Sequence, residues 1–110
     1  MKSRTYNMAG SLSLGQEVIV TLQQMPYTEL SNIVFYDDTG SVVIASGEVK
    51  VTLSPDAVNY RTVENGTFDA SDAQNEDREQ PNAISLAISA KITMNVTGAT
   101  KYALTLYQSE

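Results

Sequence analysis

Acidic side chains form the densest cluster of chemically capable residues in this chain. Five carboxylates and one arginine give residues 69–79 a charge of −4, and the whole chain has a charge of −6. The six charged residues of the stretch are Asp69, Asp72, Glu76, Asp77, Arg78 and Glu79. Calcium takes several carboxylate and carbonyl oxygens, but the run that begins Asp69-Ala70-Ser71-Asp72 lacks the alternating aspartates and central glycine of calcium-binding loops. We therefore predict a solvated acidic loop over residues 69–82 and no bound metal.

A catalytic centre is not indicated elsewhere either. Asp37 and Asp38 are adjacent carboxylates, but neighbours in a turn usually point apart and accept hydrogen bonds from local amides. The chain has no His and no Cys, so the usual general base near neutral pH, disulfides and thiolate ligands are all missing. A small hydrolase built on carboxylates ranks last, because no base is paired with a nucleophile. We predict that the chain is not an enzyme and uses no cofactor.

Tyrosines offer a second kind of chemistry, which is stacking against sugar rings. Tyr36, Tyr60 and Tyr107 are candidates for such a platform, although half-buried tyrosines are common in sheets and the chain has no Trp. Residues 65–67 and 95–97 match the Asn-x-Thr pattern of glycosylation. No secretion signal is recognisable, so we expect both sequons to stay unmodified.

The distribution of charge argues against two further classes of partner. The seven Lys and Arg residues are scattered and form no basic stripe, so nucleic acid and anionic membrane surfaces are not expected partners. No apolar run reaches the length of a signal-peptide core or a membrane span. We expect the chain to be made in the cytoplasm.

The elements that position these residues are predicted to be strands. Residues 49–53 alternate apolar and polar side chains, Ser54-Pro55-Asp56-Ala57 favours a type I turn, and a second alternation starts at Val58. Residues 49–70 therefore read as a β-hairpin, and Asn65-Gly66 as the next reversal. Further strands are expected over residues 12–22, 30–36, 41–46, 84–96 and 102–106.

Short strands at this spacing, without an amphipathic helix, predict the fold class. We expect an all-β chain, an antiparallel β-sandwich of about seven to eight short strands with an Ig-like or jelly-roll-like arrangement. Residues 12–110 form this single domain. Because the strand over residues 30–36 is apolar on both faces after Asn32, we expect it to be central or at a subunit contact, and the chain to form a homo-oligomer such as a trimer or small ring.

Residues 1–11 are predicted to be a flexible N-terminal arm. They are poor in aliphatic residues, and they combine basic and apolar side chains that can become ordered on a partner: Lys2, Arg4, Tyr6 and Met8. We assign partner docking to these four residues. On this view, deleting residues 1–10 leaves the fold nearly intact.

Two segments carry a resemblance to a known class of proteins. The stretch 47–70, with its Ser-Pro-Asp turn followed by Asn-Tyr and Glu-Asn-Gly-Thr-Phe-Asp-Ala, and the stretch 95–108 resemble small β-sandwich structural proteins of tailed bacteriophages. This chain has Ala57 where those relatives have Gly, and a residue other than glycine disfavours positive φ there.

The resemblance implies a non-enzymatic virion component, such as a capsid decoration, head-to-tail or tail-accessory protein. Such a protein binds other virion structural proteins, is located in the virion and needs no cofactor. The alternative is a carbohydrate-binding β-sandwich module for attachment to the host surface, with a glycan as its ligand and the tyrosines as its contact residues.

Overall fold

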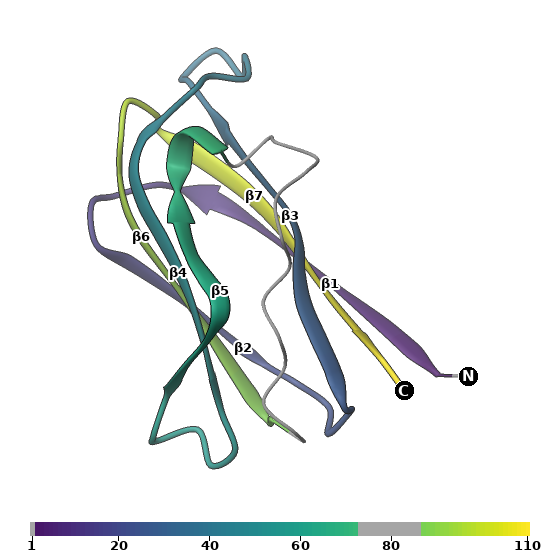
Figure 1. Cartoon of the computed structure of the whole chain (residues 1–110). Helices are drawn as coiled ribbons and strands as arrows, with labels where there is room; N and C mark the ends of the chain where they lie inside the picture. Colours follow the sequence, from purple (N-terminus) through teal and green to yellow (C-terminus); the bar gives the residue numbers. More distant parts are fainter. Residues whose placement is uncertain (1, 73–86) are drawn as a thin grey trace.

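The computed structural model describes residues 2–72 and 87–110, with the side chains of residues 64 and 65 excepted, and these residues form a β-sandwich. Two antiparallel sheets face each other (Figure 1). The first has three strands in the order β1–β7–β3, and the second has four in the order β2–β6–β4–β5. The predicted fold class is therefore confirmed, with seven strands among the described residues.

The strands of each sheet come from distant parts of the chain. In the smaller sheet, β7 (Lys101–Ser109) lies between β1 (Ser3–Ser11) and β3 (Tyr27–Tyr36). In the larger sheet, β6 (Ser89–Thr97) and β4 (Ser46–Ser54) are central, and β2 (Gln16–Thr21) and β5 (Arg61–Asp69) are the edges. A short 3-10 helix, η1 (Ala70–Asp72), follows β5.

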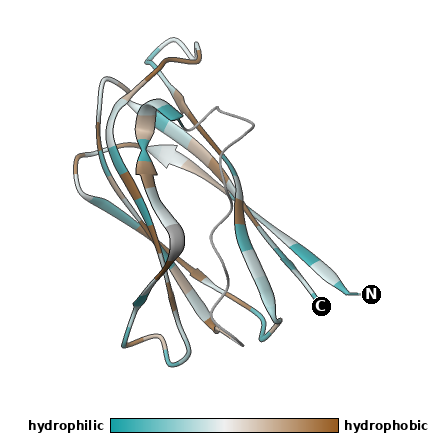
Figure 2. Ribbon diagram, in the orientation of Figure 1, coloured by the Kyte–Doolittle hydropathy of each residue, from teal (hydrophilic) through white to brown (hydrophobic). Residues whose placement is uncertain are grey.

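Alternating side chains build the core between the two sheets. Val49, Val51 and Leu53 of β4 are buried, while Lys50 between them lies on the outer face. Strands β6 and β7 repeat this alternation, and Figure 2 shows that apolar residues recur along both sheets. The largest fully buried side chains come from both layers and include Phe35, Leu30, Ile33, Ile92, Met94 and Leu106. Burial of these apolar side chains is the main stabilising contribution to the fold.

The predicted hairpin over residues 49–70 is confirmed, because β4 and β5 pair antiparallel. The predicted reversal at Asn65-Gly66 is wrong. These residues lie inside β5, where the pairing shifts from Lys50↔Thr67 to Thr52↔Thr62 and leaves a bulge. Gly66 is buried in the bulge, and a Cβ there would lie 2.7 Å from the carbonyl oxygen of Val51. Glycine therefore permits a close approach of two strands here.

The chain before β4 also departs from the prediction. Strand β3 is an edge of its sheet, not a central strand, and its pairing with β7 is interrupted between Leu30 and Asn32. Asn32 is exposed, and the outer face beyond it carries Val34 and Tyr36, which are both half-buried. The expected strand over residues 41–46 is reduced to a single bridge between Tyr36 and Val42. The expectation of a central strand is therefore wrong, whereas the expectation of a subunit contact at β3 stays a prediction.

The expected flexible arm is replaced by a strand. Residues 3–11 form β1, which pairs with β7 in an uninterrupted register from Ser3↔Ser109 to Ser11↔Lys101. Removing residues 1–10 would strip one edge of the smaller sheet, so that deletion is no longer expected to be neutral. Of the predicted acidic loop over residues 69–82, Asp69 ends β5 and residues 70–72 form η1, while residues 73–82 lie outside the described residues.

Among the described residues, no helix is long and apolar enough to cross a membrane.

Candidate assembly surface at the edge strand β1

The predicted docking residues belong to β1 or directly precede it. Arg4, Tyr6 and Met8 alternate along β1 and pair with residues of β7 that point into the sandwich, so their side chains lie on the inner face of the sheet. Tyr6 and Met8 are half-buried and contact the core, whereas Lys2 and Arg4 are exposed. The Arg4 guanidinium lies 5.3 Å from the centre of the Tyr6 ring, at cation–π distance. Tyr6 and Met8 therefore help to hold β1 on the domain.

A buried amide holds β1 to the rest of the sandwich. Gln108 is fully buried, and its side-chain oxygen accepts hydrogen bonds from the Tyr6 hydroxyl (2.6 Å) and the Gln23 amide (3.1 Å). Its side-chain nitrogen donates to the Gln23 carbonyl (2.8 Å) and the Thr28 hydroxyl (3.0 Å). Burying a primary amide is costly unless its donors and acceptors are paired, and here they are. This cluster connects β1, the β2–β3 loop, β3 and β7.

The backbone of β1 bonds to β7 through its even-numbered residues. The Leu12 amide donates to the Thr100 carbonyl at 2.9 Å, and Lys2 accepts from the Glu110 amide at 3.1 Å, at the two ends of the ladder. Hydrogen-bonded pairs alternate along an antiparallel ladder, so the even residues between these ends also bond to β7. The N–H and C=O groups of the odd-numbered residues therefore point away from the sheet, namely those of Ser3, Thr5, Asn7, Ala9 and Ser11.

Within the described part of the chain, no strand or loop pairs with this side of β1. The strand also lacks the features that usually protect a sheet edge. It is nine residues long, has no proline, has no bulge in its pairing with β7, and carries one charged residue, Arg4. All its residues are exposed or half-buried.

The other three edges are better protected. Strand β3 has an irregular register and is capped at its end by the loop, where the Val43 amide donates to the Phe35 carbonyl. Strand β5 contains the bulge and begins and ends with Arg61 and Asp69. Strand β2 has six residues and carries Glu17, which forms an ion pair with Lys91 at 3.7 Å. By these criteria, β1 is the edge best suited to accept another strand.

On the outer face of the smaller sheet, the side chains beside β1 are polar and mostly small. A shallow hollow of about 350 Å³ lies at the end where β1 finishes. It is lined by Ala9, Gly10, Ser11, Tyr36, Lys101, Tyr102 and Ala103. Its walls are mainly apolar and hold no paired acid and base, so the hollow has no evident catalytic chemistry.

The three tyrosines considered for sugar stacking do not form one platform. Tyr36 is opposite Lys101 on the smaller sheet, and Tyr107 is six residues further along β7, about 20 Å away at strand spacing. Tyr60 directly precedes β5 and packs on the larger sheet, where its hydroxyl bonds the Ser89 hydroxyl at 2.8 Å and the Lys91 ammonium lies 4.1 Å from its ring centre. The expectation of a shared platform is therefore wrong.

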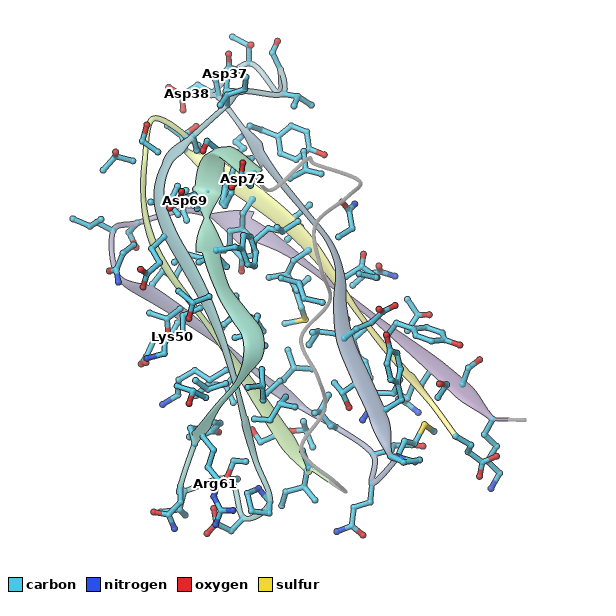
Figure 3. The ribbon with its side chains drawn as sticks, viewed as in Figure 1. Asp37, Asp38, Lys50, Arg61, Asp69 and Asp72 are labelled. Atoms are coloured by element: carbon cyan, nitrogen blue, oxygen red, sulfur yellow. The ribbon has the colours of Figure 1, made fainter. Side chains whose placement is uncertain are left out.

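The carboxylates occupy turns and ends of strands. Figure 3 shows Asp37 and Asp38 in the β3–β4 loop, and Asp69 and Asp72 on a different element, the end of β5 and η1. Asp37 accepts from the Thr39 hydroxyl and from the amides of Thr39 and Ser41, and these bonds lower the pKa of its carboxyl. The predicted turn role of Asp37 is confirmed. No three acidic residues of the described chain lie close enough to hold a metal ion.

The Ser-Pro-Asp turn after β4 is held by Asp56. Its carboxylate accepts from the amides of Asn59 (2.7 Å) and Val58 (2.9 Å), which lower its pKa, together with the Asn59 side chain and the Ser54 hydroxyl. Ala57 lies between these residues with a φ of 61°. The turn therefore places a left-handed backbone at Ala57, its fourth residue, a position at which type I turns favour glycine.

Sequence reasoning missed both the ordered state of β1 and the role of Gln108. The alternation of Tyr6 and Met8 with Thr5 and Asn7 was a period-2 signal, but its apolar members were too few to suggest a strand. Only the pairing with β7 shows which face they occupy.

Comparisons with known proteins place the chain in no family. No family model matches, and no curated protein matches. Among solved structures, the chain is similar to one from Bacillus endospore appendages, described as forming a novel family of disulfide-linked pili, with 12% sequence identity and a TM-score of 0.46. The match covers 98% of this chain and 87% of that chain. Similarity at this level says nothing about the function of the present protein.

Proposed function

We propose that this protein is a non-enzymatic structural component that acts by protein–protein assembly. The observation that carries the proposal is β1, a nine-residue edge strand whose outward backbone groups have no partner within the described chain. Proteins that function alone usually protect such an edge, because it is a template for pairing with another chain. An unprotected edge is therefore a natural site for assembly by strand addition.

The particle that we propose is the virion of a tailed bacteriophage. This part of the proposal is supported by the resemblance of residues 47–70 and 95–108 to small β-sandwich virion proteins. A role in attachment to sugars has less support, since Tyr36, Tyr60 and Tyr107 lie apart. The proposed partners are other virion structural proteins and further copies of the same chain.

Quantitative mass spectrometry of density-purified particles tests the virion role. We expect the chain in the particles at a fixed copy number relative to the major structural protein. Asn7→Lys places a charge on the outward edge of β1 and should reduce incorporation. Thr97→Lys adds the same charge at an exposed position of β6, away from β1, and should be incorporated normally. Absence of the chain from particles, with the soluble protein abundant, would show that the virion role is wrong.

A further inference from the structure

We infer that β1 pairs with β1 of a second copy, in antiparallel orientation, about a two-fold axis at Asn7. The inference rests on the proposed function and names the partner and the register of that assembly. The pairing would join two three-stranded sheets into one continuous sheet with the order β3–β7–β1–β1–β7–β3.

The backbone groups of β1 determine which register can form. On β1, only the odd-numbered residues have N–H and C=O groups without a partner among residues 2–72 and 87–110. A second strand must therefore place odd residues opposite odd residues. The register centred on Asn7 places Ser3 opposite Ser11 and Thr5 opposite Ala9 of the other copy. It is the self-pairing that uses every outward group of the strand, with two hydrogen bonds per pair and about ten in all.

The side chains are self-complementary in the same register. On the inner face, Tyr6 of each copy lies opposite Met8 of the other, in a pair that is not hydrogen-bonded, where side chains are closest. Both are half-buried in the single chain and would cover each other's exposed surface. Sulfur–aromatic contacts of this kind are favourable.

Charge and size are also compatible with this register. Arg4, the one charged residue of β1, lies opposite Gly10 of the other copy and not opposite another Arg4. On the outer face, the pairs consist of Ser, Thr, Ala and Asn, which are small enough to allow the two strands to approach. Because a two-fold axis relates the copies, the contact closes on itself. A dimer therefore replaces the trimer or ring expected from the sequence.

Sedimentation velocity of the full chain at high micromolar concentration tests the inference. We expect a dimer for the original sequence and a monomer for Asn7→Pro. Proline at position 7 removes an outward N–H and the exposed hydrogen bond that the Thr105 hydroxyl donates to the Asn7 side chain (2.9 Å), but no backbone bond to β7. The fold should therefore be retained, as circular dichroism can verify. Asn7→Lys places two ammonium groups opposite each other at the axis and should weaken the dimer without altering the backbone. Thr97→Lys is the control with the same charge and should remain dimeric.

Disulfide trapping tests the register. The chain has no cysteine, so a single introduced cysteine can form a disulfide only with the same position of a second copy. Asn7→Cys should give a covalent dimer on mild oxidation, because directly opposite residues of a hydrogen-bonded pair have Cα atoms about 5.5 Å apart. Ser3→Cys should not, because the two copies of position 3 are eight residues apart along the strands, about 26 Å.

Two results would overturn the inference. The first is a monomer at every concentration for the original chain. The second is a dimer that Asn7→Pro and Asn7→Lys leave unchanged, which would place the contact elsewhere. If the chain is monomeric in solution but enters particles in a manner that depends on Asn7, the assembly function stands and the partner of β1 is a different virion protein.

Discussion

Tyr6 on β1 donates a 2.6 Å hydrogen bond to the side-chain oxygen of Gln108 on β7, and this bond lies at the inner face where the two strands meet. Gln108 also bonds the Gln23 backbone and the Thr28 hydroxyl. The N-terminal strand is therefore held by backbone pairing and by a buried polar cluster.

Replacing Gln108 with leucine should destabilise the protein. Leucine keeps most of the volume but leaves the Gln23 carbonyl and the Thr28 and Tyr6 hydroxyls without Gln108 as their partner, while the Gln23 amide can still donate to the Tyr6 hydroxyl at 3.1 Å. We expect a cost of about 2–3 kcal/mol in the free energy of unfolding. Tyr6→Phe removes one donor, while the Gln23 amide still bonds Gln108, and should cost about 1 kcal/mol. Urea unfolding measures both. Equal effects of the two substitutions would contradict the central role of Gln108.

Alanine at position 47 should disrupt the pairing of β4 with β6. Gly47 has a φ of 120°, and a Cβ there would lie 2.0 Å from the Asn95 carbonyl oxygen, so the strands would have to separate. We expect a loss on the order of 3 kcal/mol or more in unfolding free energy. Gly40→Ala is a matched control, with a φ of 85° but no atom within 4 Å. It should cost only the backbone strain, about 1–2 kcal/mol, so a smaller effect at position 47 would refute the prediction.

Glycine at position 57 should stabilise the protein. Ala57 adopts a φ of 61°, which glycine reaches without steric cost. Part of the gain is offset because glycine makes the unfolded chain more flexible. We therefore expect the free energy of unfolding, measured by heat or urea, to rise by about 0.5–1 kcal/mol. Ala57→Val should have the opposite sign, because a β-branched side chain tolerates this conformation less well. A loss of stability in the glycine variant would show that the turn changes conformation.

Tyr27 should ionise late in an alkaline titration. Its hydroxyl donates to the Glu29 carboxylate at 2.6 Å, and this bond raises its pKa to about 12. Because the folded pKa lies above the ordinary value of about 10, this contribution to stability is intact below pH 10 and is lost as the pH rises through 12. Ultraviolet titration of the original chain against Tyr27→Phe identifies its signal. Glu29→Gln should lower the pKa, and an unchanged titration would exclude the hydrogen bond as the cause.

The sequence by itself determined the fold class and the central hairpin. Alternation at Val49, Val51 and Leu53 indicates which side chains a strand buries, and the Ser-Pro-Asp turn indicates where the chain reverses. Both patterns are local in the sequence, so they can be recognised without knowing which strands lie beside them. The turn role of Asp37 was predictable for the same reason, since its hydrogen bonds go to residues within four positions along the chain.

The tertiary structure decided which strands are edges and what the N-terminal residues do. Ser3 to Ser11 carry too few apolar residues to predict a strand, and they are ordered by β7, about a hundred residues away in sequence. The same pairing directs the N–H and C=O groups of five β1 residues away from the sheet, and it places the Tyr6 side chain beside Gln108. Asn65-Gly66, a strong local turn signal, became a bulge because β4 continues beside it. Strand order and register depend on contacts between distant segments, and a local pattern contains no information about them.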